Sequence, residues 1–375
     1  MRHGTVGKLI PVAALALAAF TVSLWPATPG ITFPDGKFVP KDSIYLFLCI
    51  GNSAMSGRDT LPDTTTVAHE WKFRISPADY DWKPAKDPAC SDANTSESDP
   101  KGGPTIPMIR ELGKLNPKVT VCVMQYSASG WTQADHYAYG KDGYVAIVKY
   151  AEQLGPNVKI AGIVSMFNLV EVQNCGTAAC IGNYSGSIQA MVSSFRNDLK
   201  TIDASLANVP YIHAGYPVMA GNGGSGNYLP TTPEGVAMIA EIAKIPGLVP
   251  NSVVIPTDSC SICHSCTPLG YYSHYDSYGN HRFGKREADT IAARGWFPLP
   301  GSTSVVEHMV RSRLGYAPSI HKVLFDGSNW SAFGNEGKSF TVYAPSGRAL
   351  SVSAENSLRA RNLLPGIYFV KPDIR

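Results

Sequence analysis

Strand-like and helix-like segments alternate along the chain from about residue 41 to residue 296. Short apolar runs occupy 44–50, 119–124, 158–166, 209–212 and 252–255. Helical patterns lie between and after them, at 104–115, 143–154, 187–202, 232–244 and 283–294. Strands joined through helices predict a parallel sheet covered on both faces, because each crossover returns the chain in the same right-handed sense. We expect a flavodoxin-like three-layer α/β/α domain with about five parallel strands.

The two ends of the chain differ from this alternating part. Residues 1–30 begin with basic side chains and continue into an apolar run, which is typical of a signal peptide or an N-terminal anchor. Residues 319–375 contain short strand-like runs separated by turns, which predict a small all-β module. The main domain is therefore expected to span 31–318.

Two insertions follow the carboxyl ends of predicted strands. Residues 59–103 are interpreted as loop, with aromatic side chains that could stack on sugars, and 221–229 are rich in Gly and Asn. Loops at the carboxyl ends of strands commonly form binding sites, so both insertions could line a binding site. The net charge of +3 is small and scattered, so nucleic acid and anionic membrane surfaces are not expected partners. Membrane contact is expected only through an uncleaved N-terminal segment.

The eight cysteines fall into two groups. Cys49 and Cys122 lie inside apolar runs and are predicted to be buried thiols. The other six lie in polar segments, and an even number in an exported chain predicts disulfides: Cys90, Cys175, Cys180, Cys260, Cys263 and Cys266. Cys175 and Cys180 could close a local loop, and Cys90 could pair within the 260–266 group.

Residues 260–264 also match the haem-attachment pattern C-x-x-C-H, and Cys and His there could bind zinc. A disulfide knot is preferred, because no second haem ligand is marked. His213, His264 and His281 are expected to be core or loop histidines rather than catalytic ones.

A serine follows the first apolar run. The run stops at Gly51, and a segment of mostly small residues then leads through Ser53 to Arg58. Open α/β sheets bind ligands at the carboxyl ends of their strands, so Ser53 is a candidate nucleophile. The alternative is a serine that only hydrogen-bonds its own turn.

The sequence GNSAMSGR at 51–58 resembles the GQSNMxGR block of the SGNH/GDSL hydrolases, in the branch of sialate O-acetylesterases and acetylxylan esterases. Three later stretches resemble further family blocks in the same order: GGPTIPMIREL at 102–112, QYSASGWTQAD at 125–135 and SHYDSYGNHRFGKREAD at 273–289. The likeness spans about 41–295, and its first and last blocks are the specific ones. It implies a three-layer esterase that requires no metal or organic cofactor.

The resemblance also implies roles for individual residues. Ser53 would be the nucleophile and His274 its base, because a serine hydroxyl must pass its proton to an imidazole as it attacks. The N–H groups of Ser53 and Gly130, with the side-chain amide of Asn168, would bind the oxyanion. Substrate contacts are implied for Asn52, Arg58, Trp131 and Glu171.

Two positions depart from the family pattern. The third block reads SMFNLVE at 165–171, which leaves Asn168 as the amide nearest the expected place; the alternative is an ordinary turn residue. Tyr271 stands where the family has the catalytic Asp. Asp276 and Asp258 are the nearby carboxylates that could act instead, or a backbone carbonyl could support a Ser–His dyad. In a well-studied triad, disabling the acid lowers turnover by about 10⁴.

These observations together predict an exported carbohydrate O-acetylesterase, secreted or at the cell surface. Its substrate would be an acetylxylan-like polysaccharide or an acetylated sugar such as sialic acid. The 319–375 module resembles the C-terminal β modules of secreted bacterial carbohydrate-active proteins, which favours a polysaccharide. Because of Tyr271 and the altered third block, the alternative is a catalytically degraded, glycan-binding member of the family.

Overall fold

The structure is a computed structural model. It describes residues 28–58, 61–75, 80–90, 98, 100–128, 130, 132, 142–167, 169–175, 177–217, 230–261 and 274–300, and five strands between 321 and 372. The expected signal or anchor falls mainly in 1–27, outside this description. None of the described helices combines the length and apolar character needed to cross a bilayer.

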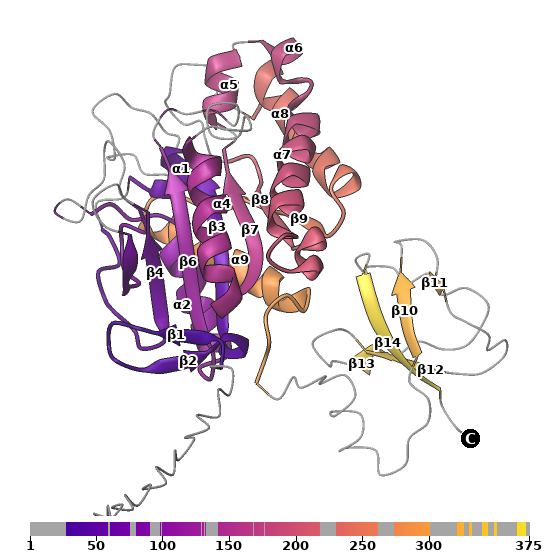
Figure 1. Ribbon diagram of the computed structural model, residues 1–375. Coiled ribbons are helices and arrows are strands. Elements are labelled where there is room, and N and C mark those ends of the chain that lie inside the picture. The colour runs from indigo at the N-terminus through magenta and orange to yellow at the C-terminus, as the bar shows by residue number, and fades with distance from the viewer. Residues whose placement is uncertain are drawn as a thin grey trace, which may run out of the picture.

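A seven-stranded sheet forms the centre of the main domain (Figure 1). Its strand order is β5-β4-β6-β3-β7-β8-β9. The five predicted strands are all present and parallel to one another: β3 (Ile44–Gly51), β6 (Thr120–Ser127), β7 (Lys159–Met166), β8 (Tyr211–Ala214) and β9 (Ser252–Ile255). The three-layer fold is therefore confirmed, with more strands than expected.

The two additional strands come from the first insertion. β4 (Glu70–Arg74) pairs in parallel with β6, and β5 (Asp81–Pro84) pairs antiparallel with β4 at the edge of the sheet. The interpretation of 59–103 as loop is therefore wrong for these residues. β4 escaped recognition because it buries two charged side chains, Glu70 and Lys72, and so lacks the apolar run of a buried strand.

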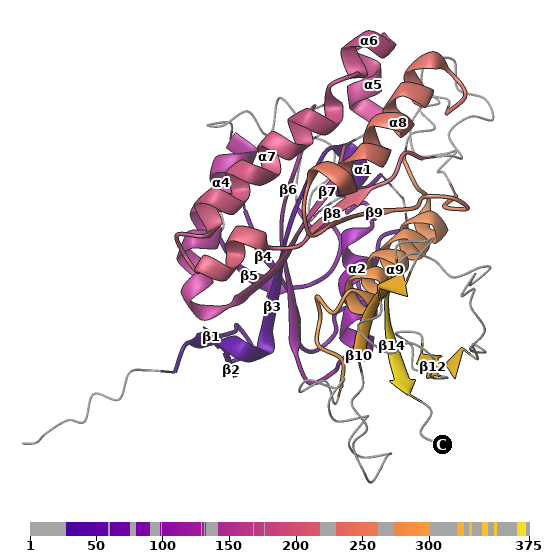
Figure 2. The ribbon, with the colours of Figure 1, turned by 90° about the vertical axis from the view of Figure 1, so that its right-hand side faces the viewer.

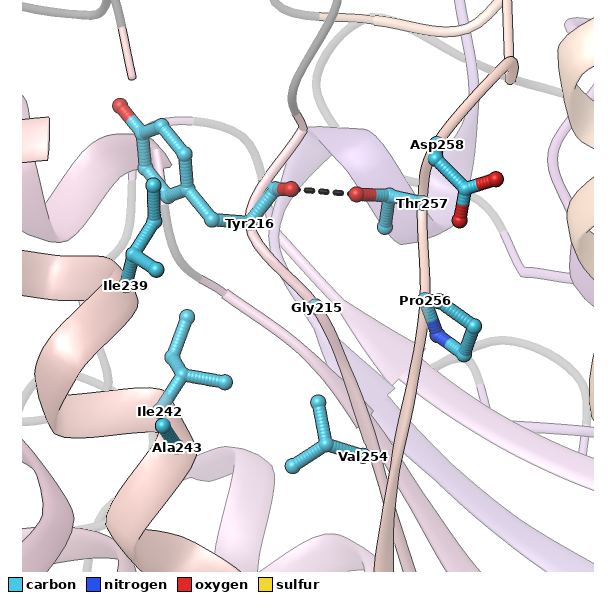
Figure 3. A pocket seen from close by; sticks show the side chains of 9 residues that line it. All are labelled: Gly215, Tyr216, Ile239, Ile242, Ala243, Val254, Pro256, Thr257 and Asp258. Atoms are coloured by element: carbon cyan, nitrogen blue, oxygen red, sulfur yellow. Dashed lines mark hydrogen bonds between the residues drawn. The ribbon is translucent and has the colours of Figure 1, made fainter. Parts of the chain in front are cut away.

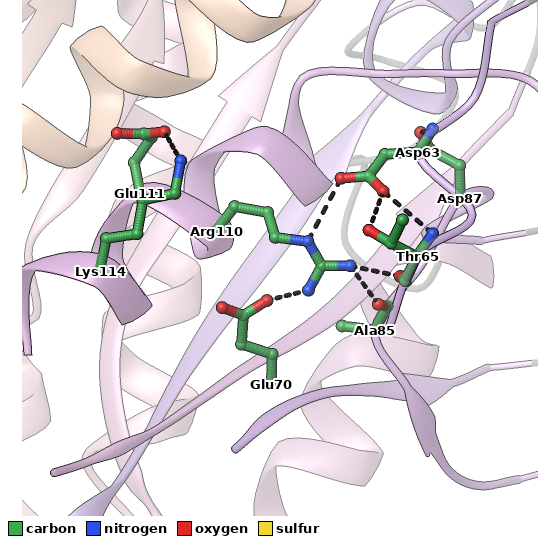
Figure 4. Close-up of polar contacts among 8 residues, drawn as sticks. All are labelled: Asp63, Thr65, Glu70, Ala85, Asp87, Arg110, Glu111 and Lys114. Atoms are coloured by element: carbon green, nitrogen blue, oxygen red, sulfur yellow. Dashed lines mark hydrogen bonds and ion pairs between the residues drawn. The ribbon is translucent and has the colours of Figure 1, made fainter. Parts of the chain in front are cut away.

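Both buried charges find partners that are remote in sequence. The Lys72 ammonium donates to the carbonyl oxygens of Lys86, at 3.2 Å, and Pro88, at 2.6 Å. Glu70 accepts from the guanidinium of Arg110 on the neighbouring helix (Figure 4). Charges are buried in proteins when they are paired in this way, and the pairing cannot be read from a local window of sequence.

Arg110 also anchors the loops around these strands (Figure 4). Its Nε lies 3.2 Å from the carboxylate of Asp63, and its Nη2 donates to the carbonyl oxygens of Thr65, at 2.5 Å, and Ala85, at 2.8 Å. One buried guanidinium thus holds three parts of the insertion against the helix that follows it.

Among the described residues, five long helices cover the sheet, three on one face and two on the other (Figure 2). The first face carries α4 (Asp142–Leu154), α7 (Tyr184–Leu199) and α8 (Pro233–Leu248); the second carries α2 (Thr105–Leu115) and α9 (Ser277–Ala293). Successive residues of β3 point to opposite faces of the sheet. Leu46 and Leu48 therefore pack in the core on the first face, and Phe47 and Cys49 pack in the core on the second face.

Capping residues set where two of these helices begin. Thr232 accepts a hydrogen bond from the N–H of Gly235 at 3.1 Å, so the predicted start of α8 is confirmed. α9 begins six residues before the predicted 283, because the Asp276 carboxylate accepts from the N–H of Gly279 at 2.7 Å. The early turn is polar, and apolar periodicity alone did not reveal it.

The described part of the main domain also contains shorter elements. β1 (Gly30–Thr32) and β2 (Phe38–Pro40) form a hairpin. The short α-helices are α1 (Ser53–Ser56), α5 (Leu169–Cys175) and α6 (Ala178–Ile181). Single 3₁₀ turns are η1 (Lys41–Ser43), η2 (Gly155–Asn157) and η3 (Ala204–Asn208).

A separate antiparallel sheet lies in the C-terminal region, in the order β11-β10-β14-β12-β13. Its strands are β10 (His321–Phe325), β11 (Trp330–Ser331), β12 (Phe340–Tyr343), β13 (Ala349–Leu350) and β14 (Gly366–Pro372). The strand character expected for 319–375 is present. The boundary at 318 stays a prediction, since 301–320 lie outside the described residues.

The predicted buried thiols and the local disulfide are confirmed. Cys49 and Cys122 are fully buried, and burial raises the pKa of both thiols well above the usual value. A disulfide joins Cys175 at the end of α5 to Cys180 in α6. This link closes the small loop between the two helices.

Two other disulfide candidates were wrong. Cys90 and Cys260 are buried thiols outside any disulfide. The Cys90 sulfur lies 2.8 Å from the hydroxyl of Ser127 at the end of β6, and Cys260 lies in the core beneath α9, where burial raises its pKa to about 11. Cys263 and Cys266 lie outside the described residues.

Candidate active site

The candidate site lies at the carboxyl end of β3. After β3 the chain forms the parallel strands β4 and β6 on one side of it, and the next parallel strand, β7, lies on the other side. The order of the strands therefore reverses at β3, and such a switch point opens a crevice outside the strand ends. Ser53 is the first residue of α1, two positions beyond the end of β3.

Glycines allow the tight turn that carries Ser53. A Cβ atom on Gly51 would lie 2.5 Å from the carbonyl oxygen of Met166 on β7. Gly57 has a φ of 86°, and a Cβ there would lie 1.9 Å from the carbonyl oxygen of Gly102. A larger residue is excluded at both ends, because the backbone of the turn touches neighbouring backbone.

Asn52 holds this turn against β7. Its side-chain Nδ2 donates to the carbonyl oxygen of Phe167 at 2.6 Å, and its Oδ1 accepts from the N–H of Ala54 at 3.0 Å. The residue is fully buried. Both polar atoms of the amide thus make contacts inside the protein, and a substrate contact for Asn52 stays a prediction.

Arg58 is also largely buried, at the far end of the turn. Its Nη1 donates to the carbonyl oxygen of Gly57 at 2.5 Å and lies 3.4 Å from the Ser56 hydroxyl. These contacts stabilise the turn. A substrate contact for Arg58 stays a prediction.

His274 precedes α9 and is positioned by the cap of that helix. Asp276 accepts from the Ser261 hydroxyl at 2.5 Å, and its own N–H donates to the Ser261 carbonyl at 3.2 Å. A Cβ on Gly279 would lie 2.1 Å from the same carbonyl oxygen, so the first turn of α9 packs directly on this segment. The backbone around His274 is thus tied to the chain that leaves β9.

The structure brings Ser53 and His274 together. The distance from the Ser53 hydroxyl oxygen to Nε2 of His274 is 2.8 Å, although 221 residues separate the two. Ser53 is half-buried and His274 retains 8% of its surface exposed. A hydroxyl within hydrogen-bond distance of an imidazole can lose its proton to that ring as it attacks an electrophile.

The two candidate acids make other contacts. Both oxygens of the Asp258 carboxylate face Arg286, at 3.4 and 3.3 Å, and 65% of this side chain is exposed. Asp276 caps α9 and binds Ser261. The role of catalytic acid for Asp258 or Asp276 therefore stays a prediction. Tyr271, which occupies that position in the sequence, lies outside the described residues.

The remaining predicted residues lie beyond the ends of β6 and β7. Gly130 is exposed and has a φ of 73°, a conformation that glycine adopts without strain. Glu171 is half-buried in the first turn of α5. Asn168 and Trp131 lie outside the described part of the chain, so the oxyanion and substrate roles stay predictions.

Sequence reasoning missed Gln125 on β6. This buried side chain lies beside the turn, and its Nε2 contacts the carbonyl oxygen of Met55 at 3.4 Å and the Ser127 hydroxyl at 3.0 Å. Gln125 thus supports α1 from the side opposite to Asn52. A polar residue at the end of an otherwise apolar strand was the available signal.

A shallow apolar cavity of about 270 Å³ lies between α8 and the ends of β8 and β9 (Figure 3). Ile239, Ile242 and Val254 line it, and a hydrogen bond from the Thr257 hydroxyl to the Tyr216 carbonyl closes its rim. Its lining offers few groups that could bind sugar hydroxyls. Among the described residues, no cluster of three His, Cys, Asp or Glu side chains could hold a metal ion.

The three-layer fold with a serine at the switch point is the arrangement that the sequence resemblance to the SGNH/GDSL hydrolases implied. The family described as "Carbohydrate esterase, sialic acid-specific acetylesterase" matches residues 43–292, which is more than half of the chain. The chain therefore belongs to this family and is a carboxylic ester hydrolase of the acetylesterase type.

Solved structures show the same fold at low identity. A protein from Arabidopsis thaliana is 16% identical with a TM-score of 0.50, and the match covers 66% of this chain and 98% of that one. NanS is 12% identical with a TM-score of 0.52, and the match covers 68% and 98% of the two chains. No curated protein matches the sequence.

Proposed function

We propose that this chain is an exported O-acetylesterase that removes acetyl groups from an acetylated polysaccharide or sugar through an acetyl-enzyme on Ser53. The observation that carries the proposal is the 2.8 Å contact between the Ser53 hydroxyl and His274 Nε2 at the switch point of the sheet. Membership of a carbohydrate esterase family supports a sugar ester as substrate.

In the first half of the reaction, the Ser53 oxygen bonds to the acetyl carbonyl carbon while His274 Nε2 accepts the hydroxyl proton. The N–H groups of Ser53 and Gly130 and the amide of Asn168 bind the oxyanion. The carbon–oxygen bond to the sugar then breaks, and the proton passes from His274 to the leaving sugar oxygen. In the second half, water loses a proton to His274 and attacks the acetyl carbon. The bond from that carbon to the Ser53 oxygen then breaks, His274 returns the proton to this oxygen, and acetate leaves.

Two features support an extracellular location. The basic and apolar 1–30 segment is typical of an export signal, and the Cys175–Cys180 disulfide is of a kind that persists in oxidising compartments. The C-terminal β sheet favours a polymer such as acetylated xylan, whereas the family description favours acetylated sialic acid.

The proposal is tested by acetate release from p-nitrophenyl acetate, acetylxylan and O-acetylated sialic acid, measured in parallel for the wild type and a Ser53→Ala variant. We expect release from at least one sugar ester and its loss in the variant. Equal rates in the two proteins would refute the role of Ser53. Glycan binding without acetate release would instead support the catalytically degraded alternative.

A further inference from the structure

A buried asparagine on α9 connects the two halves of the candidate site. Asn280 retains 3% of its surface exposed, and its Nδ2 donates to the carbonyl oxygens of Tyr275, at 3.4 Å, and Gly102, at 3.2 Å. Tyr275 directly follows His274. The hydrogen bond from Asn280 to Tyr275 therefore holds the backbone beside the imidazole.

The second hydrogen bond of the same NH₂ group, to Gly102, leads to the turn that carries Ser53. Gly102 packs so closely on Gly57 that a Cβ on Gly57 would lie 1.9 Å from the Gly102 carbonyl oxygen. The N–H of Gly57 in turn donates to the carbonyl oxygen of Ser53 at 2.9 Å. A continuous series of backbone contacts thus runs from Asn280 to the nucleophile.

The neighbours determine the orientation of the amide. Both carbonyl oxygens need a donor, so the NH₂ group must face them; after a flip, Oδ1 would face two acceptors. In the present orientation Oδ1 is buried and has no hydrogen-bond partner among the described residues. Native proteins seldom leave a buried acceptor unpaired, and exceptions tend to occur where another requirement dominates.

We propose that Asn280 is a positioning residue that sets the distance between the Ser53 hydroxyl and His274 Nε2. Its two N–H donors connect the backbone beside His274 to the backbone that packs on the Ser53 turn. These two segments are far apart in the sequence, so only a tertiary contact can hold them at a fixed distance. Asn280 would affect the reaction only through Ser53 and His274, so this inference depends on the proposed function. Displacing a reacting group by about 1 Å can cost about 10² in rate.

The test compares Asn280→Ala and the isosteric Asn280→Asp with a matched control, Asn116→Ala. Asn116 is also a buried asparagine, and its Nδ2 donates to the carbonyl oxygen of Pro298 at 2.9 Å. It caps the C-terminal end of α2, close to the first residues of β6. It therefore lies near the amino-terminal end of β6, whereas Ser53 lies beyond the carboxyl end of β3. Its replacement removes a similar contact without touching the site.

The readouts are kcat and KM for p-nitrophenyl acetate, the rate of Ser53 labelling by a fluorophosphonate, and stability in urea. We expect both Asn280 variants to lose about 10- to 100-fold in kcat and in labelling rate, with KM within about threefold. Asn116→Ala should keep kcat within about twofold, although its stability falls by a similar amount. Equal losses in Asn280→Asp and Asn280→Ala would assign the effect to the missing donors rather than to volume.

Other outcomes overturn one proposal without the other. If Ser53→Ala is inactive while both Asn280 variants keep the kcat of Asn116→Ala, the positioning role is wrong and the proposed function stands. If Ser53→Ala is fully active, the proposed function fails first. Should Asn280→Ala not fold, Asn280→Asp keeps the volume of the side chain and loses its NH₂ group, and full kcat in that variant alone would also overturn the proposal.

Discussion

The described part of the chain holds a second serine–histidine contact, and its geometry is close to that of the first. The Ser165 hydroxyl lies 2.7 Å from Nδ1 of His213, compared with 2.8 Å between Ser53 and Nε2 of His274. Ser165 and His213 are fully buried between β7 and β8, whereas Ser53 is half-buried beyond the end of β3. Only the location of Ser53 can admit a substrate.

The surroundings of the buried pair also prevent proton transfer. The Tyr211 hydroxyl lies 2.9 Å from Nδ1 of His213, and the Tyr184 hydroxyl lies 3.2 Å from Nε2. Burial lowers the pKa of His213 to about 3, because the positively charged ring cannot be solvated in the core. An imidazole that resists protonation is a poor general base, so His213 is the core histidine that the sequence predicted.

The comparison teaches that distance alone does not identify a catalytic pair. Access to the hydroxyl and the freedom of the ring to accept a proton are also required. The two pairs differ in both respects while they share the same residue types and nearly the same separation.

The largest expected effect comes from removing each serine in turn. Ser53→Ala should lower kcat for p-nitrophenyl acetate by about 10⁴-fold or more, as loss of a nucleophile does in other serine hydrolases. Ser165→Ala should stay within about tenfold of the wild type and lose about 1–2 kcal/mol of stability, because it breaks a buried hydrogen bond. A larger kcat loss in Ser165→Ala than in Ser53→Ala would reverse the assignment.

The next effect concerns the turn that presents Ser53. Asn52→Ala removes the amide contacts to Phe167 and Ala54 and should lower kcat by about 10²-fold, because the hydroxyl loses its fixed position. Thr232→Ala is the control, since it removes a helix cap on α8 at a cost of about 1 kcal/mol. Comparable kcat values in the two variants would show that Asn52 serves stability alone.

The low pKa of His213 should also make the free energy of unfolding depend on pH. The pKa of His213 is lower in the folded state, about 3, than in the unfolded chain, about 6.5. The unfolded chain therefore takes up a proton as the pH falls below 6.5, and folding weakens between pH 6.5 and 3. Urea unfolding should show the wild type losing about 2 kcal/mol more than His213→Asn between pH 7 and pH 5. Parallel losses in the two proteins would contradict the low pKa.

The smallest effect is expected for Asp258→Asn. Its ion pair with Arg286 is mostly exposed, and such pairs contribute about 0–1 kcal/mol. We expect kcat within about threefold of the wild type. A loss approaching 10⁴-fold, as in a triad without its acid, would assign Asp258 to His274 after all.

Local patterns in the sequence predicted much of the fold. The runs that became β3, β6, β7, β8 and β9 were apolar, and the start of α8 carried its own cap. β4 was missed because Glu70 and Lys72 depend on partners outside any local window. Cys90 was taken for a disulfide half because its buried contact with Ser127 comes from a strand almost forty residues away.

The candidate site divides in the same way. Sequence resemblance identified Ser53 and His274 as residues, and the two glycines of the turn were already visible in GNSAMSGR. It did not reveal that Asn52 is buried against the end of β7, or that Asp258 pairs with Arg286 on α9. Gln125 and Asn280 were not identified, because a polar side chain becomes a support only through the backbone it meets.

The sequence by itself determined the order of the five apolar parallel strands and the helices between them, and the identity of the hydroxyl and the imidazole, because periodicity and short motifs act over neighbouring residues. Only the tertiary structure decided that Ser53 meets His274 across 221 residues, and that Ser165 and His213 meet where no substrate can reach them. Burial and long-range contacts are properties of the packed chain, and those properties separate an accessible serine–histidine pair from a buried one.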